Sequence, residues 1–320
     1  MQPKLWQAEE TVSSELAFKL IQTQFPNLAP LTLELLGAGW DNTAYLVNKQ
    51  FVFRFPRRQI AVDLIELETR VLPKIAQQLP LPVPNPIFLG QPCEDYVWPF
   101  SGYELLAGQT ACRAHLTSQE RCQIAKPLGE FLKALHSLKE EAPDDKLKRL
   151  NVEMRWPAAH QNLTQIKQLG FLSHPKHLFD LLESLKEVRN QSQHKVLCHG
   201  DFYARHLLIN SKRQLCGIID WGDVHLGPPA IDLAILFSFL PQEAQADFLK
   251  AYGPIDKNTE QNALFRALYS ASLLAVYAHD VGDTDLLQEA LFALNQNLNN
   301  ISPLEHQGNR DIPNSTNGQG

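Results

Sequence analysis

The segment VLCHGDFYARHLLINSKRQLCGIIDWGDVHLGPPAID, residues 196–232, constrains the fold of this chain more than any other. Short apolar runs alternate in it with polar loops. The runs at Leu207–Ile209 and Leu215–Ile219 predict buried strands, as does the apolar pair that opens the segment. Asp201 and Asp220 follow the first and the last of these runs, where strands open into loops. Carboxylates on such rigid supports suit a catalytic base and a metal ligand, as phosphoryl transfer requires.

The length and charge of the chain limit its organisation and its partners. With 320 residues it exceeds the usual size of one hydrophobic core, so two lobes are expected. The hydrophobic content of 44% and the charged content of 20% are those of an ordinary soluble globular protein. The formal net charge of -6 argues against a nucleic-acid partner, which needs a basic surface, and against anionic membranes.

Cysteine usage and hydropathy indicate a cytoplasmic protein. The N-terminal sequence MQPKLWQAEE lacks the apolar core of a secretory signal, and no apolar run approaches the roughly 18 residues that span a bilayer. The five cysteines are widely spaced and odd in number, so reduced thiols are expected: Cys93, Cys112, Cys122, Cys198 and Cys216.

The first hundred residues predict a sheet with helices. An amphipathic helix is expected over 11–25, and a second one over Ile60–Gln78. Between and after them, apolar and alternating runs predict five antiparallel strands. The expected strands are Leu31–Leu36, Ala44–Val47, Phe51–Phe55, Ile87–Leu89 and Tyr96–Trp98.

A glycine loop, Gly37-Ala38-Gly39, joins two of these strands and suits a nucleotide. Without side chains at the glycines, backbone N–H groups can approach phosphate oxygens, although an ordinary hairpin turn is the alternative. Arg54, at the end of the next strand, places a cation where it could reach the phosphates. Arg57 and Arg58 are expected in a solvated turn.

From residue 101 onward the sequence predicts a mainly helical lobe. The looser segment 99–104 is expected to be the lobe boundary, so the predicted division is 1–100, 101–302 and a disordered tail over 303–320. The charged stretch 139–149 is expected to be exposed, and the insertion 151–190 to form part of the wall of an acceptor cleft. Helices are expected at 118–136, 175–189, 229–240, 242–252, 258–279 and 284–299.

Two motifs at close spacing, His-Gly-Asp with a polar residue five positions after its Asp and then Ile-Asp-Trp, resemble those of a known family. Together with the upstream glycine loop they are similar to the aminoglycoside and macrolide phosphotransferases, over roughly residues 31–300. The resemblance implies an α+β, protein-kinase-like bilobal fold, with a five-stranded antiparallel sheet in the N-terminal lobe and a mainly helical C-terminal lobe. Backbone recognition of the base leaves the choice between ATP and GTP open.

The resemblance also implies roles for individual residues. Asp201 would be the catalytic base and Asp220 a ligand of Mg²⁺. His206 occupies the position at which the family usually has a metal-binding Asn, and it either binds the metal or serves the hydrogen bonding of its loop. His199 would hold the catalytic loop, and Asp232 resembles a buried aspartate that binds the backbone of that loop.

Nucleotide binding is assigned by the same resemblance. Gly37, Gly39 and Asn42 would contact the phosphates, and Arg54 would replace the usual lysine. Glu68 is the expected acidic partner of Arg54, with Glu66 as the competing position because spacing alone does not decide, and Asp223 either lines the acceptor site or caps a turn.

The function implied is transfer of the γ-phosphoryl group of ATP or GTP to a hydroxyl of a small molecule. An aminoglycoside, a macrolide or a related metabolite would be the acceptor, and a metabolite kinase of the choline, homoserine or fructosamine type would use the same groups. A catalytically silent nucleotide-binding module is the rival from another class, although it has no need for both Asp201 and Asp220. A protein kinase lacks support, since no Ala-Pro-Glu segment follows Asp220.

Overall fold

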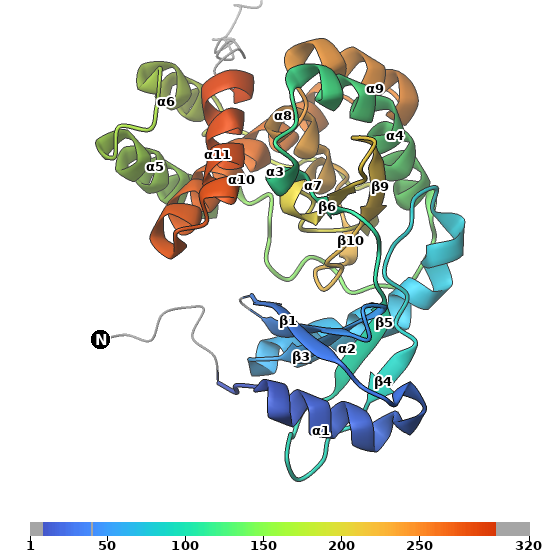
Figure 1. Ribbon diagram of the computed structural model, residues 1–320. Coiled ribbons are helices and arrows are strands. Elements are labelled where there is room, and N and C mark those ends of the chain that lie inside the picture. The colour runs from blue at the N-terminus through green and yellow to red at the C-terminus, as the bar shows by residue number, and fades with distance from the viewer. Residues whose placement is uncertain (1–8, 40, 299–320) are drawn as a thin grey trace, which may run out of the picture.

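The computed structural model describes residues 9–39 and 41–298 and has two lobes, with the helical lobe above the sheet lobe in the view of Figure 1. One lobe is built on a five-stranded antiparallel sheet, and the other is mainly helical. The predicted α+β bilobal fold is therefore confirmed. None of the helices in the described ranges is long and apolar enough to span a membrane.

The N-terminal sheet has the strand order β1-β2-β3-β5-β4. Its fifth strand lies at Phe100–Glu104, where Ser101 pairs with Arg54, and not at 96–98 as predicted. Tyr96 and Trp98 gave the alternating apolar pattern of a strand, but they are buried from a loop, packed against each other's rings at a centroid distance of 6.1 Å. The bounds are β1 (Leu33–Ala38), β2 (Asn42–Val47), β3 (Phe51–Pro56), β4 (Phe88–Gly90) and β5 (Phe100–Glu104).

This shift of the last strand moves the end of the N-terminal sheet. Residues 100–104 belong to the sheet, so the boundary predicted between residues 100 and 101 falls inside a strand. The chain then passes through 105–108 to the second lobe, where β6 (Gln109–Thr110) pairs with β8 (Leu207–Ile209). The expected tail over 303–320 lies outside the described residues.

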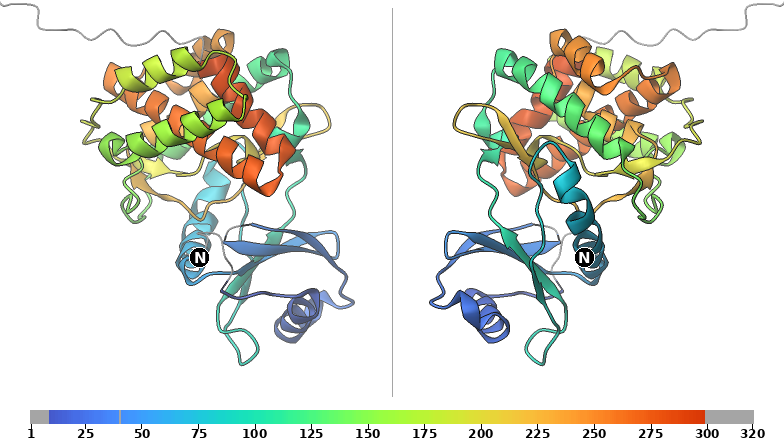
Figure 2. Two further views of the ribbon diagram at one scale, coloured as in Figure 1. Left: turned by 90° about the vertical axis from the view of Figure 1, so that its left-hand side faces the viewer. Right: turned by 90° about the vertical axis from the view of Figure 1, so that its right-hand side faces the viewer.

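Two helices accompany the sheet in different ways. Helix α1 (Ser14–Gln24), capped by Ser13, lies on the side of the sheet away from the second lobe, where it helps to enclose an aromatic core (Figure 2). Helix α2 (Gln59–Ile75) rises beside the sheet, and its C-terminal turn, including Leu72, joins the core of the second lobe. Burial of α2 against both lobes places its residues close to the boundary between them.

The second lobe packs its helices around short strands that carry the motif segment. The core is continuous, and it includes the fully buried ring of Trp221 beside Phe131. The helices are α3 (Ala111–Ala114), α4 (Ser118–Ser137), α5 (Val152–Gln168), α6 (Pro175–Ser184), α7 (Ala230–Leu233), α8 (Ile235–Ser238), α9 (Gln245–Tyr252), α10 (Lys257–Val281) and α11 (Thr284–Phe292). The remaining strands are β7 (Val196–Cys198), β9 (Leu215–Ile218) and β10 (His225–Gly227).

Three expectations for this lobe need correction. The apolar segment 229–240 is buried as expected but forms two short helices, α7 and α8, in place of one. Helix α6 ends at Ser184, five residues before the predicted end at 189. Arg149, placed by prediction in an exposed stretch, is buried because it forms ion pairs with two carboxylates.

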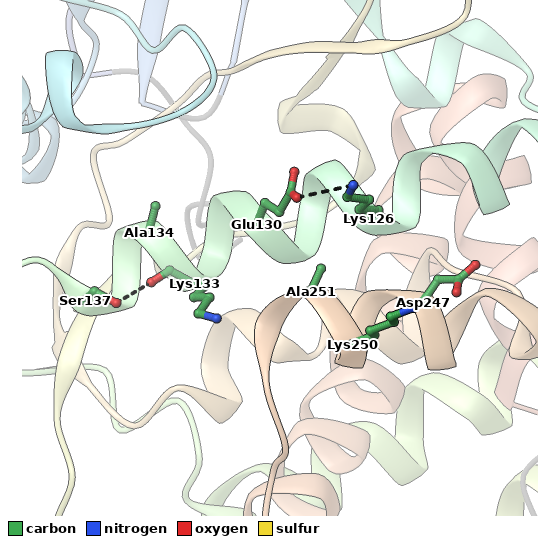
Figure 3. A pocket seen from close by; sticks show the side chains of 8 residues that line it. All are labelled: Lys126, Glu130, Lys133, Ala134, Ser137, Asp247, Lys250 and Ala251. Carbon is green, nitrogen blue, oxygen red and sulfur yellow. Dashed lines mark hydrogen bonds and ion pairs between the residues drawn. The ribbon is translucent and has the colours of Figure 1, made fainter.

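Helices α4 and α9 approach each other closely at Gly129. A Cβ atom at this position would lie 2.6 Å from the carbonyl oxygen of Phe248 and 3.1 Å from the Cβ of Ala251. Figure 3 shows the surface hollow beside this contact, which is lined by exposed side chains of both helices, including Lys133, and by none of the predicted site residues.

Replacement of Gly129 should therefore destabilise the second lobe. We expect Gly129→Ala to lower the free energy of unfolding by about 1–3 kcal/mol, because backbone atoms cannot move aside as a flexible side chain would. Urea unfolding followed by circular dichroism measures this change. Lys133→Ala, on the exposed face of the same helix, is the control and should leave the midpoint almost unchanged; equal midpoints for both variants would contradict the packing argument.

Candidate active site

The loop that carries Asp201 is held by buried hydrogen bonds. Asp232 of α7 accepts the backbone N–H of His199 at 2.7 Å and that of Gly200 at 2.9 Å. The Nε2 of His199 donates to the carbonyl oxygen of Ile219 at 3.0 Å, which ties this loop to the segment that leads to Asp220. The roles predicted for His199 and Asp232 in holding the loop agree with these contacts.

Gly200 is needed at its place in this loop for two reasons. Its φ of +88° is in the left-handed region that favours glycine, and a Cβ atom there would lie 2.2 Å from the backbone oxygen of Asp223. The close approach places Asp223 directly against the loop that carries Asp201.

Folding brings together the three residues that the motifs singled out. The Nε2 of His206 lies 3.3 Å from Oδ2 of Asp220, and its Nδ1 lies 3.8 Å from Oδ2 of Asp201. Asp220 has a φ of +65°, a conformation that costs free energy for a residue other than glycine and that is often found at functional sites. Residues from the loop after β7, from the 3-10 turn before β8 and from the segment after β9 thus meet at one point.

Arg54 connects this cluster to the N-terminal lobe. Its Nη1 lies 2.7 Å from Oε2 of Glu68 on α2, and its Nη2 lies 3.0 Å from Oδ1 of Asp220. Burial favours the neutral guanidine, but Glu68 and Asp220 outweigh it and raise the pKa of Arg54. Glu68 is 1% exposed whereas Glu66 is on the exposed face of α2, so the structure identifies Glu68 as the partner of Arg54.

The donor atoms around His206 fit a divalent cation. Its Nδ1 lies 2.8 Å from the backbone oxygen of Asp201, and because a carbonyl oxygen only accepts, this nitrogen carries the hydrogen. The lone pair of a neutral Nε2 then faces the carboxylate of Asp220, an arrangement that needs a proton or a metal ion between the two atoms. Without a metal the proton is favoured, since Asp220 and Asp201 outweigh the effect of burial and raise the pKa of His206.

The glycine loop has a compact structure of its own. The N–H of Gly39 donates to the backbone oxygen of Asn42 at 2.9 Å, so this N–H is already used within the turn. Asn42 opens β2, and its Oδ1 is buried without a hydrogen-bond partner among the described residues. Arg57 donates to the carbonyl oxygen of Gly39, and Arg58 forms an ion pair with Asp41, so neither is in the freely solvated turn expected for them. Figure 1 shows the end of β1 and the start of β2 at the edge of their lobe that faces the second lobe.

A second group of charges, whose pairing was not predicted from the sequence, lies beside the loop that carries Asp201. Arg149 forms ion pairs with Asp145, at 2.6 Å, and with Asp223. Burial and the neighbouring charge of Asp201 nevertheless raise the pKa of Asp223 to about 6. The pairing of Arg149 with Asp223 could not be predicted from the local sequence, because the two residues are 74 positions apart.

The fold and the site together are those of a kinase-like phosphotransferase. In the sheet lobe, Glu68 of α2 holds the cation of Arg54. This cation meets Asp220, and His206 lies between Asp220 and Asp201. The family comparison agrees, since the model of the phosphotransferase enzyme family matches residues 32–264, more than half of the chain. The chain belongs to this family, and it is an enzyme of the phosphotransferase class.

Solved structures with the same fold include antibiotic phosphotransferases. The GDP complex of wild-type aminoglycoside 2'-phosphotransferase-IIIa is 25% identical over 88% of this chain and 97% of its own, with a TM-score of 0.64. The GDP and kanamycin complex of APH(2")-IIia is 23% identical over 87% and 96%, with a TM-score of 0.65. The macrolide 2'-phosphotransferase MphH from Brachybacterium faecium is 19% identical over 88% and 97%, with a TM-score of 0.55. The predicted resemblance is thus confirmed.

Removal of the charge of Glu68 should destabilise the folded protein, because its partner Arg54 is buried. We expect Glu68→Gln to lower the free energy of unfolding by on the order of 3 kcal/mol, as is usual when one member of a buried ion pair is neutralised. Chemical denaturation measures the effect, and Glu66→Gln, two residues away on the exposed face of α2, is the matched control. A stable Glu68→Gln variant with unchanged nucleotide affinity would show that the pair is dispensable.

Proposed function

We propose that the protein transfers the γ-phosphoryl group of ATP or GTP to a hydroxyl group of a small molecule. The observation that carries this proposal is the cluster of Asp201, His206 and Asp220 next to the Arg54–Glu68 pair. Phosphoryl transfer depends mainly on positioning and on neutralisation of charge, and these residue types supply both. In this proposal residues 9–104 form the nucleotide-binding lobe, and the remainder supplies the catalytic and acceptor groups.

Asp201 is the proposed base. The acceptor oxygen attacks the γ-phosphorus in line, the bond from this phosphorus to the β,γ-bridging oxygen breaks, and the nucleoside diphosphate leaves. The hydroxyl proton goes to the carboxylate of Asp201, so the products are a phosphate monoester and the protonated base. Because Asp232 and His199 hold the loop, Asp201 keeps its position relative to the acceptor without a change of fold.

Asp220 and His206 are the proposed residues that hold Mg²⁺, which when bound neutralises charge on the phosphate oxygens. Arg54 is the proposed phosphate-binding cation, and Gly37, Gly39 and Asn42 form the loop proposed to cover the phosphates. Because the N–H of Gly39 is used within the turn, contact with phosphate oxygens would have to come from other backbone groups of that loop.

The acceptor belongs either to the antibiotics bound by the similar structures or to hydroxylated metabolites of the choline, homoserine or fructosamine type. A catalytically silent nucleotide-binding module is the alternative function. It differs from the enzyme in one measurable respect, since a silent module would bind nucleotide without transferring phosphate to any acceptor.

Neutralisation of Asp201 provides the first test of the proposal. Asp201→Asn should lower the rate of phosphate transfer by about 10²- to 10⁴-fold, because the hydroxyl then loses its proton acceptor. Nucleotide affinity, measured by fluorescence titration, should change little, since Asp201 faces the acceptor and not the nucleotide. Unchanged turnover in Asp201→Asn would exclude Asp201 as the base.

Removal of the imidazole tests the metal site. His206→Ala should weaken binding of Mn²⁺ to the nucleotide complex by about tenfold or more, and His206→Asn should preserve binding of Mg²⁺, because an amide oxygen suits that ion. Electron paramagnetic resonance of bound Mn²⁺ measures the affinity independently of turnover. In the wild type the affinity should fall as the pH decreases, since a protonated Nε2 cannot bind a cation. Equal Mn²⁺ affinities for wild type and His206→Ala would place the metal elsewhere.

A further inference from the structure

Arg149 is a buried cation that binds two carboxylates. Its side chain is 7% exposed, and its Nη1 lies 2.6 Å from Oδ1 of Asp145. Its Nη2 donates to Oδ1 of Asp223. Asp145 also accepts the backbone N–H of Arg149 at 2.5 Å, so one carboxylate orients both the backbone and the guanidinium of this residue. Because desolvation offsets much of the attraction in a buried ion pair, net stability is not what such a contact mainly provides.

The segment that carries Arg149 is itself fixed at both ends. At its start, the backbone N–H of Leu226 in β10 donates to the carbonyl oxygen of Pro143 at 2.8 Å. Near its end, Arg155 of α5 donates to the carbonyl oxygen of Leu147 at 2.6 Å. The guanidinium of Arg149 therefore reaches Asp223 from a rigid support.

The turn that contains Asp223 follows directly after the proposed metal ligand Asp220. Trp221 is fully buried and anchors the start of this turn in the core of the lobe. At its end, Nδ1 of His225 lies 2.7 Å from the carbonyl oxygen of Asp223, and because a carbonyl oxygen only accepts, this nitrogen donates. Asp223 is thus held through its side chain by Arg149 and through its backbone by His225.

The loop that carries Asp201 packs against the same turn. A Cβ atom at Gly200 would lie 2.8 Å from Nδ1 of His225 and closer still to the backbone oxygen of Asp223. Strand β10, which begins at His225, also pairs with β7, from which this loop emerges. A displacement of the turn would therefore move Asp220 on one side and the loop of Asp201 on the other.

From these contacts we propose that Arg149 is a positioning residue for phosphoryl transfer. By holding Asp223, it fixes the turn between the base Asp201 and the metal ligand Asp220, and so sets the separation of these two groups. The inference rests on the proposed function, because Arg149 acts only through the base and the metal ligand of that function. A misplacement of about 1 Å is enough to lower a rate by roughly 100-fold.

The first test compares Arg149→Met with Lys146→Met, which removes an exposed cation from the same segment. The acceptor is water, which attacks the γ-phosphorus of ATP or GTP and gives its proton to Asp201, so that inorganic phosphate and the nucleoside diphosphate are released. Phosphate release by the full-length protein is measured with Mg²⁺, and circular dichroism gives the folded fraction of each variant. Arg149→Met should lower kcat per folded molecule by about 10- to 100-fold.

The affinity for nucleotide should change little in Arg149→Met, because the proposed nucleotide-binding residues lie in the other lobe. Lys146→Met should retain the wild-type kcat. A loss of activity in Arg149→Met that only follows the loss of folded protein would mean a purely structural role, and it overturns the inference while leaving the proposed function intact.

A double-mutant cycle tests whether Arg149 acts through Asp223. Asp223→Asn should also lower kcat, and the combined variant should stay within about threefold of the slower single variant, because both changes break the same contact. Losses that multiply would show independent roles and overturn the inference. Arg149→Lys keeps a positive charge beside Asp223 and should recover part of the rate, and it replaces Arg149→Met in the cycle if that variant does not fold.

Metal binding decides the inference if the wild type releases no phosphate, a result that would count against the proposed function. Electron paramagnetic resonance measures the affinity for Mn²⁺ of the complex with a non-hydrolysable nucleotide analogue, which requires no turnover. Arg149→Met should weaken Mn²⁺ binding by about tenfold, because a residue that orients a metal ligand is lost, and Lys146→Met should leave it unchanged. Equal Mn²⁺ affinities for wild type and Arg149→Met overturn the inference.

Discussion

The guanidinium of Arg54 forms ion pairs with carboxylates from both lobes, and the geometry of the site depends on this contact. One carboxylate is that of Glu68, on α2 of the N-terminal lobe. The other is that of Asp220, which follows β9 in the second lobe. Such a buried arrangement is worth little as net stability, since desolvation offsets much of the attraction. Its value is positional, because loss of Glu68 would leave the buried guanidinium with only the half-exposed Asp220, and loss of Asp220 would remove a defined contact between the lobes.

A second set of buried hydrogen bonds gives the loop that carries Asp201 its shape. Asp232 is fully buried and remains ionised, because the bonds from two backbone N–H groups and from His136, whose Nε2 is 3.2 Å away, outweigh the penalty of burial and lower its pKa. Tyr252 of α9 holds the other nitrogen of His136 at 2.8 Å. The catalytic loop is thus connected through side chains to α4, α7 and α9, which form the rigid part of the lobe, and rigid support of this kind is what positioning catalysis needs.

Much of the fold and the centre of the site could be predicted from the sequence, for a local reason. Strand-to-loop transitions at Asp201 and Asp220, and the glycine loop before Arg54, are short patterns in which neighbouring residues carry the signal. The fifth strand was misplaced because Tyr96 and Trp98 have the alternation of a strand, yet their rings fill a core from a loop. Burial has the same residue preferences in both settings, so the pattern could not separate them.

The sequence by itself determined the family, the two-lobed fold and the residues that meet at the site. Only the tertiary structure decided between Glu66 and Glu68, because both lie on one helix and only packing shows which one is buried. The same holds for the pairing of Arg149 with Asp223, because these two residues come from segments far apart in the chain. Charge compensation is a property of three-dimensional neighbours, and residue order contains no direct record of it.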